Sequence, residues 1–370
     1  RVLAAGAIQL LFRGQQATLE GFLEAFAPQD LLRIGPLAAL GAWLSFMSGR
    51  PDQGTLLADI AERASWEGTP PDGTTSFESQ RAMLRAAMVR RGPRDALQQA
   101  WYAAAREQAG SRWLSSAQML VGCGYMMTGD EPSAVAAFEA SALPNTAALA
   151  PSISLAVLAS IRIRHGDWHG AADLIARARA RLPDAQNEDL LPGVAVSAIE
   201  ARIAAQRGDT EKARAAIVRA GIIRPVLNYG MPWVSVHALL ELARAHLAIS
   251  DPAGAQVVVR EAEQIVHKRP DLGPITAELV DFRRTLEEAT FTLAGTSTLT
   301  AAELRILQLL PTYLTFGEIA DRLAISRNTV KTHAMAIYGK LWASSRSEAV
   351  ERAVEIGLLE PYPGLARRRD

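Results

Sequence analysis

The chain has 370 residues, of which 49% are hydrophobic and 21% are charged, and its 39 basic and 39 acidic residues balance to a net charge of zero. This composition is typical of a soluble globular protein of two or more domains, and it excludes a wholly disordered chain and a polycation. The lone cysteine, Cys123, excludes an internal disulfide framework and a cysteine-based zinc site, and no apolar run is long enough to span a bilayer.

Residues 1–289 contain a recurring turn, built on Gly or once on Ser and followed by a polar residue or Pro. The clear turns begin at Gly129, Gly166, Gly208 and Ser250, and the weaker ones begin at Gly14, Gly49 and Gly92. Successive turns lie 35 to 43 residues apart and separate helix-length segments such as 155–164 and 171–181. Gly suits the left-handed end of one helix, Asp can cap the next, and the Ala after each clear turn allows close approach. The period predicts an array of helix pairs.

No strand-like alternation bounded by hairpin turns occurs, so we expect an all-α fold. The repeated segments resemble tetratricopeptide repeats (TPRs) in their turns and small residues, although their period is longer and irregular. This resemblance implies a TPR-like superhelix that acts as a sensor or interaction domain, and a scaffold without a ligand is an equal alternative. Tyr229, Trp233 and His237 are spaced four apart and are candidate effector-binding residues, with core packing as the alternative.

Metal binding and catalysis have little support in the sequence. His165 and His169 lie four residues apart, but they straddle a predicted turn and have no evident third ligand. No Ser/His/Asp set or paired carboxylates stand out, and no Gly-x-x-x-x-Gly-Lys-Ser/Thr phosphate loop occurs. We therefore expect no metal, no cofactor and no enzyme activity in this chain.

A Thr-, Ser- and Gly-rich connector at 290–298 precedes a predicted small domain at 299–360, and a basic tail at 361–370 follows it. The apolar pattern of the small domain predicts four helices, at 301–310, 316–323, 327–341 and 346–356. The three-residue turn 324–326 has the length that joins the two helices of a helix-turn-helix. Ile325, in that turn, is expected to enter the core.

Three of these four helices begin with a capping box, a hydroxyl followed three residues later by glutamate. The pairs are Thr300 with Glu303, Thr315 with Glu318, and Ser345 with Glu348. The remaining start, at Ser326, has the hydroxyl but no acid, since Arg327, Asn328 and Thr329 follow it. A helix N-terminus that meets phosphate favours such residues because its dipole and free N–H groups attract an anion. The helix 327–341 is therefore predicted to contact DNA.

This helix also divides by face. One stripe, predicted to point inward, consists of Val330, Ala334, Ile337 and Leu341. The residues on another face, which can reach a major groove, are Asn328, Lys331, Thr332 and Met335. The window 322–346 contains five basic residues and no acid, so we expect one cationic side for phosphate binding.

The small domain resembles the C-terminal helix-turn-helix of LuxR-family transcriptional regulators. The residues that carry the resemblance are Leu299, Thr300, Glu303, Glu318, Ile319, Ala320, Leu323, Ser326, Thr329, Val330, Lys331, Thr332, His333, Ile337, Tyr338, Lys340, Leu341, Ala349, Val350 and Ala353. It implies a four-helix unit whose third helix enters the major groove and whose fourth often forms a dimer contact. Trp342, Pro311 and Gly339 depart from the pattern, and Trp342 stands where the family prefers Gly.

The resemblance also assigns roles by position. Lys331, Thr332 and Met335 become base-facing residues. Thr315, Asn328, Thr329 and Lys340 become phosphate or positioning contacts, and Ser326 and Arg327 complete the predicted DNA-binding set at the start of the helix.

We therefore expect a cytoplasmic bacterial transcriptional regulator that binds double-stranded DNA as a homodimer, with RNA polymerase as a further candidate partner and no membrane partner. The helical-repeat domain would sense an effector or partner protein and control the DNA-binding domain. The array before such a domain resembles the large ATP-binding LuxR-type regulators, without their nucleotide-binding module. The alternative is a repeat-type protein-interaction adaptor with a vestigial helix-turn-helix.

Overall fold

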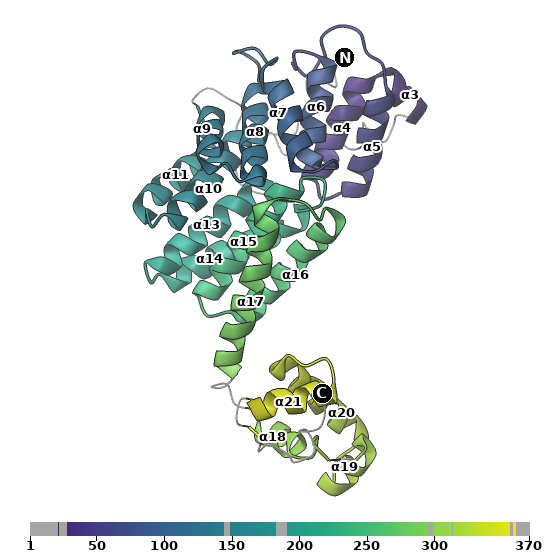
Figure 1. Ribbon diagram of the computed structural model, residues 1–370, viewed down its shortest axis with the longest axis vertical. Helices are drawn as coiled ribbons and strands as arrows, with labels where there is room; N and C mark the ends of the chain where they lie inside the picture. Colours follow the sequence, from purple (N-terminus) through teal and green to yellow (C-terminus); the bar gives the residue numbers. More distant parts are fainter. Residues whose placement is uncertain are drawn as a thin grey trace, which may run out of the picture. The chain divides into compact units, whose positions relative to one another are not determined.

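The computed structural model describes residue 21 and residues 28–143, 149–182, 191–294, 299–312, 314–355 and 358–359. The predicted turn at Gly14 and the predicted tail at 361–370 lie outside these ranges. The chain separates into two compact units, Arg1–Arg283 and Arg284–Asp370, and helix α17 (Pro274–Ala294) crosses the boundary between them (Figure 1). Helix α17 includes the first part of the predicted connector, and 295–298 lie outside the described residues.

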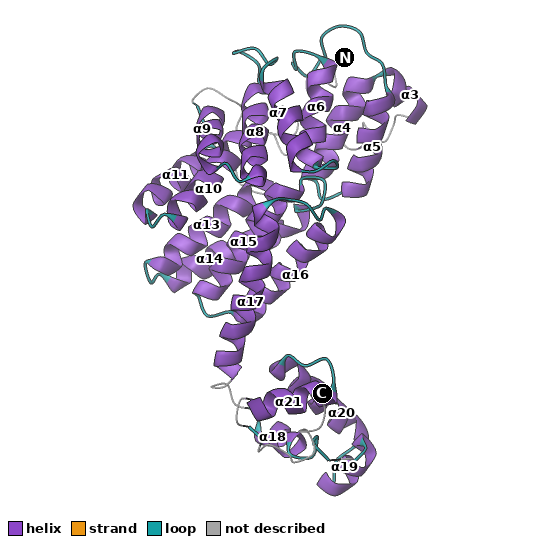
Figure 2. Ribbon diagram, viewed as in Figure 1, coloured by secondary structure: helices purple, strands orange, loops and turns teal. Residues whose placement is uncertain are grey.

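All regular structure in the described residues is helical, and no strand occurs among them (Figure 2). The all-α expectation is therefore confirmed. No helix within the described ranges is both long and apolar enough to cross a membrane.

Paired helices form the upstream unit (Figure 1). The pairs are α4 (Gly35–Met47) with α5 (Pro51–Arg63), α6 (Phe77–Met88) with α7 (Pro93–Ala104), α8 (Leu114–Thr128) with α9 (Glu131–Ser141), α10 (Leu149–Arg164) with α11 (Trp168–Ala180), α13 (Leu191–Gln206) with α14 (Thr210–Ile223), and α15 (Pro232–Ala248) with α16 (Pro252–Lys268). A short helix α3 (Pro28–Arg33) precedes them, and a 3-10 turn η1 (Arg224–Val226) separates α14 from α15. The predicted turns that lie in the described residues, from Gly49 to Ser250, each join the two helices of one pair.

The predicted roles of Gly, Asp and Ala in the clear turns are also confirmed. Gly129, Gly166 and Gly208 have φ values of 84°, 80° and 75°, the left-handed conformation that ends a helix. The aspartates that follow accept a hydrogen bond from the backbone N–H three residues on, at 2.8–3.1 Å; they are Asp130, Asp167, Asp209 and Asp251. The alanines after the turns are fully buried, which lets the paired helices approach closely; they are Ala134, Ala171, Ala213 and Ala255. Gly92 differs, because it caps the start of α7 while Val89 adopts the left-handed position after α6.

Ser250 occupies the left-handed position of its turn at φ 60°, where the other three clear turns have Gly. A side chain in this conformation costs roughly 1–2 kcal/mol, so Ser250→Gly should raise the free energy of unfolding by about 1 kcal/mol. Gly208→Ser should lower the free energy of unfolding by a similar amount. A Cβ at position 208 meets no atom within 4 Å, so the cost comes from the left-handed backbone conformation alone. Urea unfolding of both variants, followed by circular dichroism, checks the opposite signs. A shift of the same sign in both would contradict the turn analysis.

A buried carboxylate connects four helices of the upstream unit. Glu241 on α15 is fully buried and accepts hydrogen bonds from Ser160 Oγ on α10 at 2.9 Å and from Arg244 at 2.6 Å. Arg202 on α13 forms a further ion pair with Glu241, and Arg244 reaches Glu278 on α17 at 2.5 Å. Burial alone would raise the pKa of Glu241, but the two guanidinium groups outweigh it and hold the pKa well below its usual range. The network ties α10, α13, α15 and α17 together through charge as well as apolar packing.

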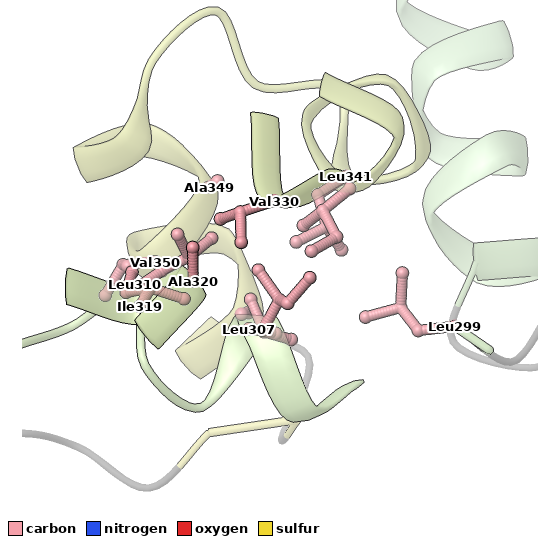
Figure 3. Close-up of a cluster of buried hydrophobic side chains, with 12 residues drawn as sticks. Leu299, Leu307, Leu310, Ile319, Ala320, Val330, Leu341, Ala349 and Val350 are labelled. Carbon is pink, nitrogen blue, oxygen red and sulfur yellow. The ribbon is translucent and has the colours of Figure 1, made fainter. Parts of the chain in front are cut away.

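The downstream unit has its own core, built by α18 (Ala301–Leu307), α19 (Phe316–Leu323), α20 (Arg327–Leu341) and α21 (Arg346–Glu355) (Figure 3). The buried members of this core are Leu299, Ile306, Leu307, Leu310, Ile319, Ala320, Val330, Ile337, Leu341, Ala349, Val350 and Ala353. The predicted bounds of α19 and α20 are confirmed. Helix α18 ends at Leu307, not at Leu310, because Pro311 has no N–H to donate to the carbonyl of Leu307, four residues earlier.

Two of the three capping boxes form with both hydrogen-bonding arms, at Thr300 with Glu303 and at Thr315 with Glu318. The third prediction is only half right. The hydroxyl of Ser345 accepts from the Glu348 N–H at 3.2 Å, but the Glu348 carboxylate accepts from the N–H of Ser344, one residue earlier, at 2.7 Å.

Candidate nucleic-acid interface

Helices α19 and α20 are joined by a tight left-handed turn. Ala324 has φ 54°, its N–H donates to Asp321 O at 3.3 Å, and the Ile325 N–H donates to Ala320 O at 3.1 Å. These bonds satisfy the last carbonyls of α19, and α20 begins two residues after Ile325. The prediction that Ile325 enters the core is wrong, because the turn leaves its side chain 37% exposed while Ile319 fills the core from α19.

The first turn of α20 is free of acids, as predicted. Ser326 caps the helix by accepting the Thr329 N–H at 3.1 Å, and the two hydroxyls share a hydrogen bond of 2.8 Å. Arg327 and Asn328 are exposed in the same turn. The helix dipole, the free N–H groups and the Arg327 charge therefore act in the same direction, and all three attract an anion.

The two predicted faces of α20 are also observed. The stripe Val330, Ala334, Ile337 and Leu341 is buried in the core of the domain. The outward residues Asn328, Lys331, Thr332 and Met335 are exposed, and we call them the α20 face. Met335 is 60% exposed, although its side chain is apolar. The Thr332 hydroxyl donates to Asn328 O at 3.0 Å, which leaves its methyl group and its acceptor capacity available to a partner.

The cationic part of this surface is narrower than the sequence suggested. Arg346 is used inside the domain, where it donates at 2.7–3.3 Å to the carbonyls of four residues between α18 and α19, namely Leu309, Leu310, Thr312 and Leu314. Lys340 pairs with Glu303 at 2.6 Å. Arg322, Arg327 and Lys331 have no ion pair within the part of the chain that the structure describes. These three provide the positive charge on the side where α20 begins.

Glu303 combines two functions. Its carboxylate completes the capping box with Thr300 and accepts the Lys340 ammonium. Burial raises the pKa of Glu303, but the hydrogen bonds from Lys340 and Thr300 outweigh burial and hold the pKa below its usual range. The pair therefore fixes the C-terminal end of α20 against the start of α18.

The three candidate effector residues have different surroundings. Trp233 and His237 are buried in α15 and stack at 5.3 Å between ring centroids, and Trp233 also stacks on Phe138 at 6.5 Å. The Tyr229 hydroxyl donates to Asp52, and the Arg269 guanidinium lies 5.3 Å from its ring centroid.

His237 should make the stability of the upstream unit sensitive to acid. Burial lowers the pKa of His237 from 6.5 to about 4, so the unfolded chain takes up this proton first as the pH falls. The free energy of unfolding should therefore fall between pH 6.5 and pH 4, by about 3 kcal/mol from this residue, and should be unaffected by it above that window. His237→Gln removes the titration, and urea unfolding at pH 4 and pH 7 should show a smaller loss in the variant. Equal losses in the two proteins would contradict a neutral buried imidazole.

The two histidines that flank the turn after α10 have carboxylate partners. His165 Nε2 lies 2.7 Å from Glu131 and His169 Nδ1 lies 3.5 Å from Asp173. No group of three or more His, Cys, Asp or Glu side chains that could hold a metal ion occurs in the described ranges.

Three residues, Trp342, Pro311 and Gly339, depart from the LuxR-family pattern, and the turn after α20 forms despite the Trp at position 342. Trp342 adopts φ 55°, its N–H donates to Gly339 O at 3.4 Å, and the Ala343 N–H donates to Tyr338 O at 2.9 Å. This is the left-handed helix end that Gly would normally form, made here by Trp. Pro311 lies in the turn after α18, and Gly339 lies on the exposed side of α20.

A protein-family model described as bacterial regulatory proteins, luxR family, matches residues 297–353, which span α18, α19, α20 and most of α21. Comparison with curated proteins gave no match, and comparison with solved structures gave none. The family match therefore identifies the downstream unit and does not extend to the upstream helical pairs. The C-terminal domain of this chain is a LuxR-family helix-turn-helix DNA-binding domain.

Proposed function

We propose that the chain is a sequence-specific transcriptional regulator in which α20 enters the major groove of double-stranded DNA. The observation that carries this proposal is the α20 face, four exposed side chains on a helix that begins without an acid and is buried along its opposite stripe. Such a helix, placed second in a helix-turn-helix, has the form of a recognition helix. The exposed charge and the exposed apolar Met335 also argue against an adaptor whose helix-turn-helix has lost DNA binding.

The residues of the interface divide into two roles. Lys331 can donate to the acceptor atoms of guanine, and the Thr332 methyl group and Met335 can contact a thymine methyl. Ser326, Arg327, Asn328 and Thr329 surround the start of α20, and Thr315 starts α19; these five suit phosphate contacts that position the helix. Lys340 joins them through the two ammonium N–H groups that Glu303 does not use.

The upstream pairs are proposed to form a TPR-like superhelix that senses an effector or partner protein and controls DNA binding. The recurring turns, capped by Asp and followed by buried Ala, support this repeat architecture. Two copies are proposed to bind adjacent half-sites and then to act on RNA polymerase. Because Ala349, Val350 and Ala353 lie in the domain's own core, the contact between copies would use the outward side of α21, where Ser347 and Glu351 are exposed.

Salt dependence separates phosphate contacts from base contacts. Arg327→Ala should weaken binding to every duplex equally and should reduce the slope of log Kd against log salt by about 1, because one phosphate contact is lost. Lys331→Ala should instead reduce the affinity for a duplex that the protein has selected from a random library, relative to its affinity for a shuffled duplex. Fluorescence anisotropy titrations of the full chain measure both quantities. Arg94→Ala, an exposed cation on α7, is the charge-matched control and should change neither. An Arg327→Ala slope equal to that of the wild type would contradict the phosphate role.

A further inference from the structure

The upstream unit contains a cavity of about 90 Å³ that lies apart from Trp233 and His237. Its walls come from α4, from the starts of α8, α10 and α13, and from Met231 before α15. A buried water needs roughly 10–15 Å³ by the same measure, so the cavity has room for about six to nine water-sized groups. That is the size of one ring with a short substituent.

Most of the cavity wall is apolar and aromatic. Trp43 on α4 and Trp113 before α8 are both buried, and their ring centroids lie 6.3 Å apart at an interplanar angle of 41°. The Trp113 indole N–H donates to Asp72 O at 3.1 Å, which fixes its ring, whereas the buried indole N–H of Trp43 has no acceptor in the described part of the chain. Met119 and Ile153 extend the same wall. Such a surface favours a flat apolar ligand.

One edge of the cavity is positive and polar. Arg112 and Ser116 both line it, and neither side chain has a hydrogen bond or ion pair within the described ranges. Arg112 is exposed, so the cavity reaches the surface at this residue. Helix α8 has no side-chain cap and no acid in its first turn. The start of α8 and the unpaired guanidinium of Arg112 both favour a carboxylate.

We propose that this cavity binds a small aromatic carboxylate, with the ring between the apolar walls and the carboxylate at Arg112 and Ser116. This inference rests on the proposed function, since it supplies the effector site of the sensing unit. It moves the site from Tyr229, Trp233 and His237 to the start of α8. A neutral ring would lose the charged contact, and an aliphatic dicarboxylate would place a second charge against the tryptophans.

Calorimetric titration of the full chain with phenylacetate and with its neutral analogue phenylacetamide tests the site. We expect saturable binding of phenylacetate with one site per chain, and binding of the amide weaker by about tenfold or more, because a charge-assisted hydrogen bond is lost. Arg112→Gln should weaken phenylacetate binding by about tenfold and leave amide binding unchanged. Ser116→Leu, which fills the cavity edge, should abolish binding of both compounds. Arg94→Gln, the charge-matched change outside the cavity, should alter neither.

Absence of phenylacetate binding up to millimolar concentration would overturn the site, and so would equal affinity for acid and amide. An Arg112→Gln variant with unchanged phenylacetate affinity would overturn the assignment of the carboxylate. The same protein preparation is titrated with duplex DNA, so that the two failures are distinguishable. Loss of the carboxylate site with intact DNA binding refutes only the site, whereas absence of sequence-specific DNA binding refutes the proposed function.

Discussion

Replacing Lys331 and Thr332 together by alanine should weaken specific DNA binding of the full chain by about 100-fold, since each good base contact contributes about 1–3 kcal/mol. Both side chains are exposed on the α20 face, where they have no role in the core of the domain. The Thr332 hydroxyl bonds only to a carbonyl of its own helix. Alanine also favours helix, so the melting temperature of the domain should stay the same or rise. An electrophoretic shift titration against a selected duplex measures the loss.

The charge-matched control for this double variant is Arg94→Ala on α7, which should leave DNA affinity unchanged. Residual nonspecific binding should remain in the double variant, because Arg322 and Arg327 still provide positive charge beside the start of α20. Unchanged affinity for the selected duplex would show that the α20 face does not read the bases.

Replacing Glu241 by glutamine should lower the free energy of unfolding of the upstream unit by about 3–5 kcal/mol, because it leaves the largely buried Arg202 without its counter-charge and leaves Arg244 with Glu278 alone. The side chains of Arg202 and Arg244 are only 14% and 20% exposed, so water cannot replace the lost partner well. Urea unfolding followed by circular dichroism measures the change.

Glu200→Gln is the matched control for the buried network. Glu200 also pairs with two arginines, Arg179 at 2.6 Å and Arg219 at 3.0 Å, but it is partly exposed. Its loss should therefore cost about 1 kcal/mol or less. Equal destabilisation by the two substitutions would contradict the importance of burial at Glu241.

The features that the sequence predicted well are local. The Gly and Asp residues of the repeated turns act within four residues of themselves, so the roles of Gly166 and Asp167 follow from the residues around them. The same is true of the cap at Ser326 and of the buried stripe on α20, since a helix repeats its faces every few residues. The bounds of α19 and α20 followed from these signals.

The features that the sequence missed depend on residues far apart in the chain. Arg346 binds carbonyls 32 to 37 residues away, and Glu241 meets Ser160 across 81 residues. The cavity beside Trp43 and Trp113 combines segments from α4 to α15.

The error at Ile325 has a local cause. The left-handed conformation of Ala324 changes the direction of the chain, and the spacing of apolar residues does not predict that conformation. Periodicity gives the faces of helices but not which distant helix each face meets.

Selection of binding sites from a random duplex library by the full chain tests the central claim most directly. We predict enrichment of one sequence, arranged as two similar half-sites if two copies bind. Its affinity at physiological salt should exceed that of a shuffled duplex by roughly 1,000-fold or more, the usual margin of specific over nonspecific binding. Failure to enrich any sequence, or equal affinity for the selected and shuffled duplexes with the same salt dependence, would contradict the assignment of α20 as a recognition helix.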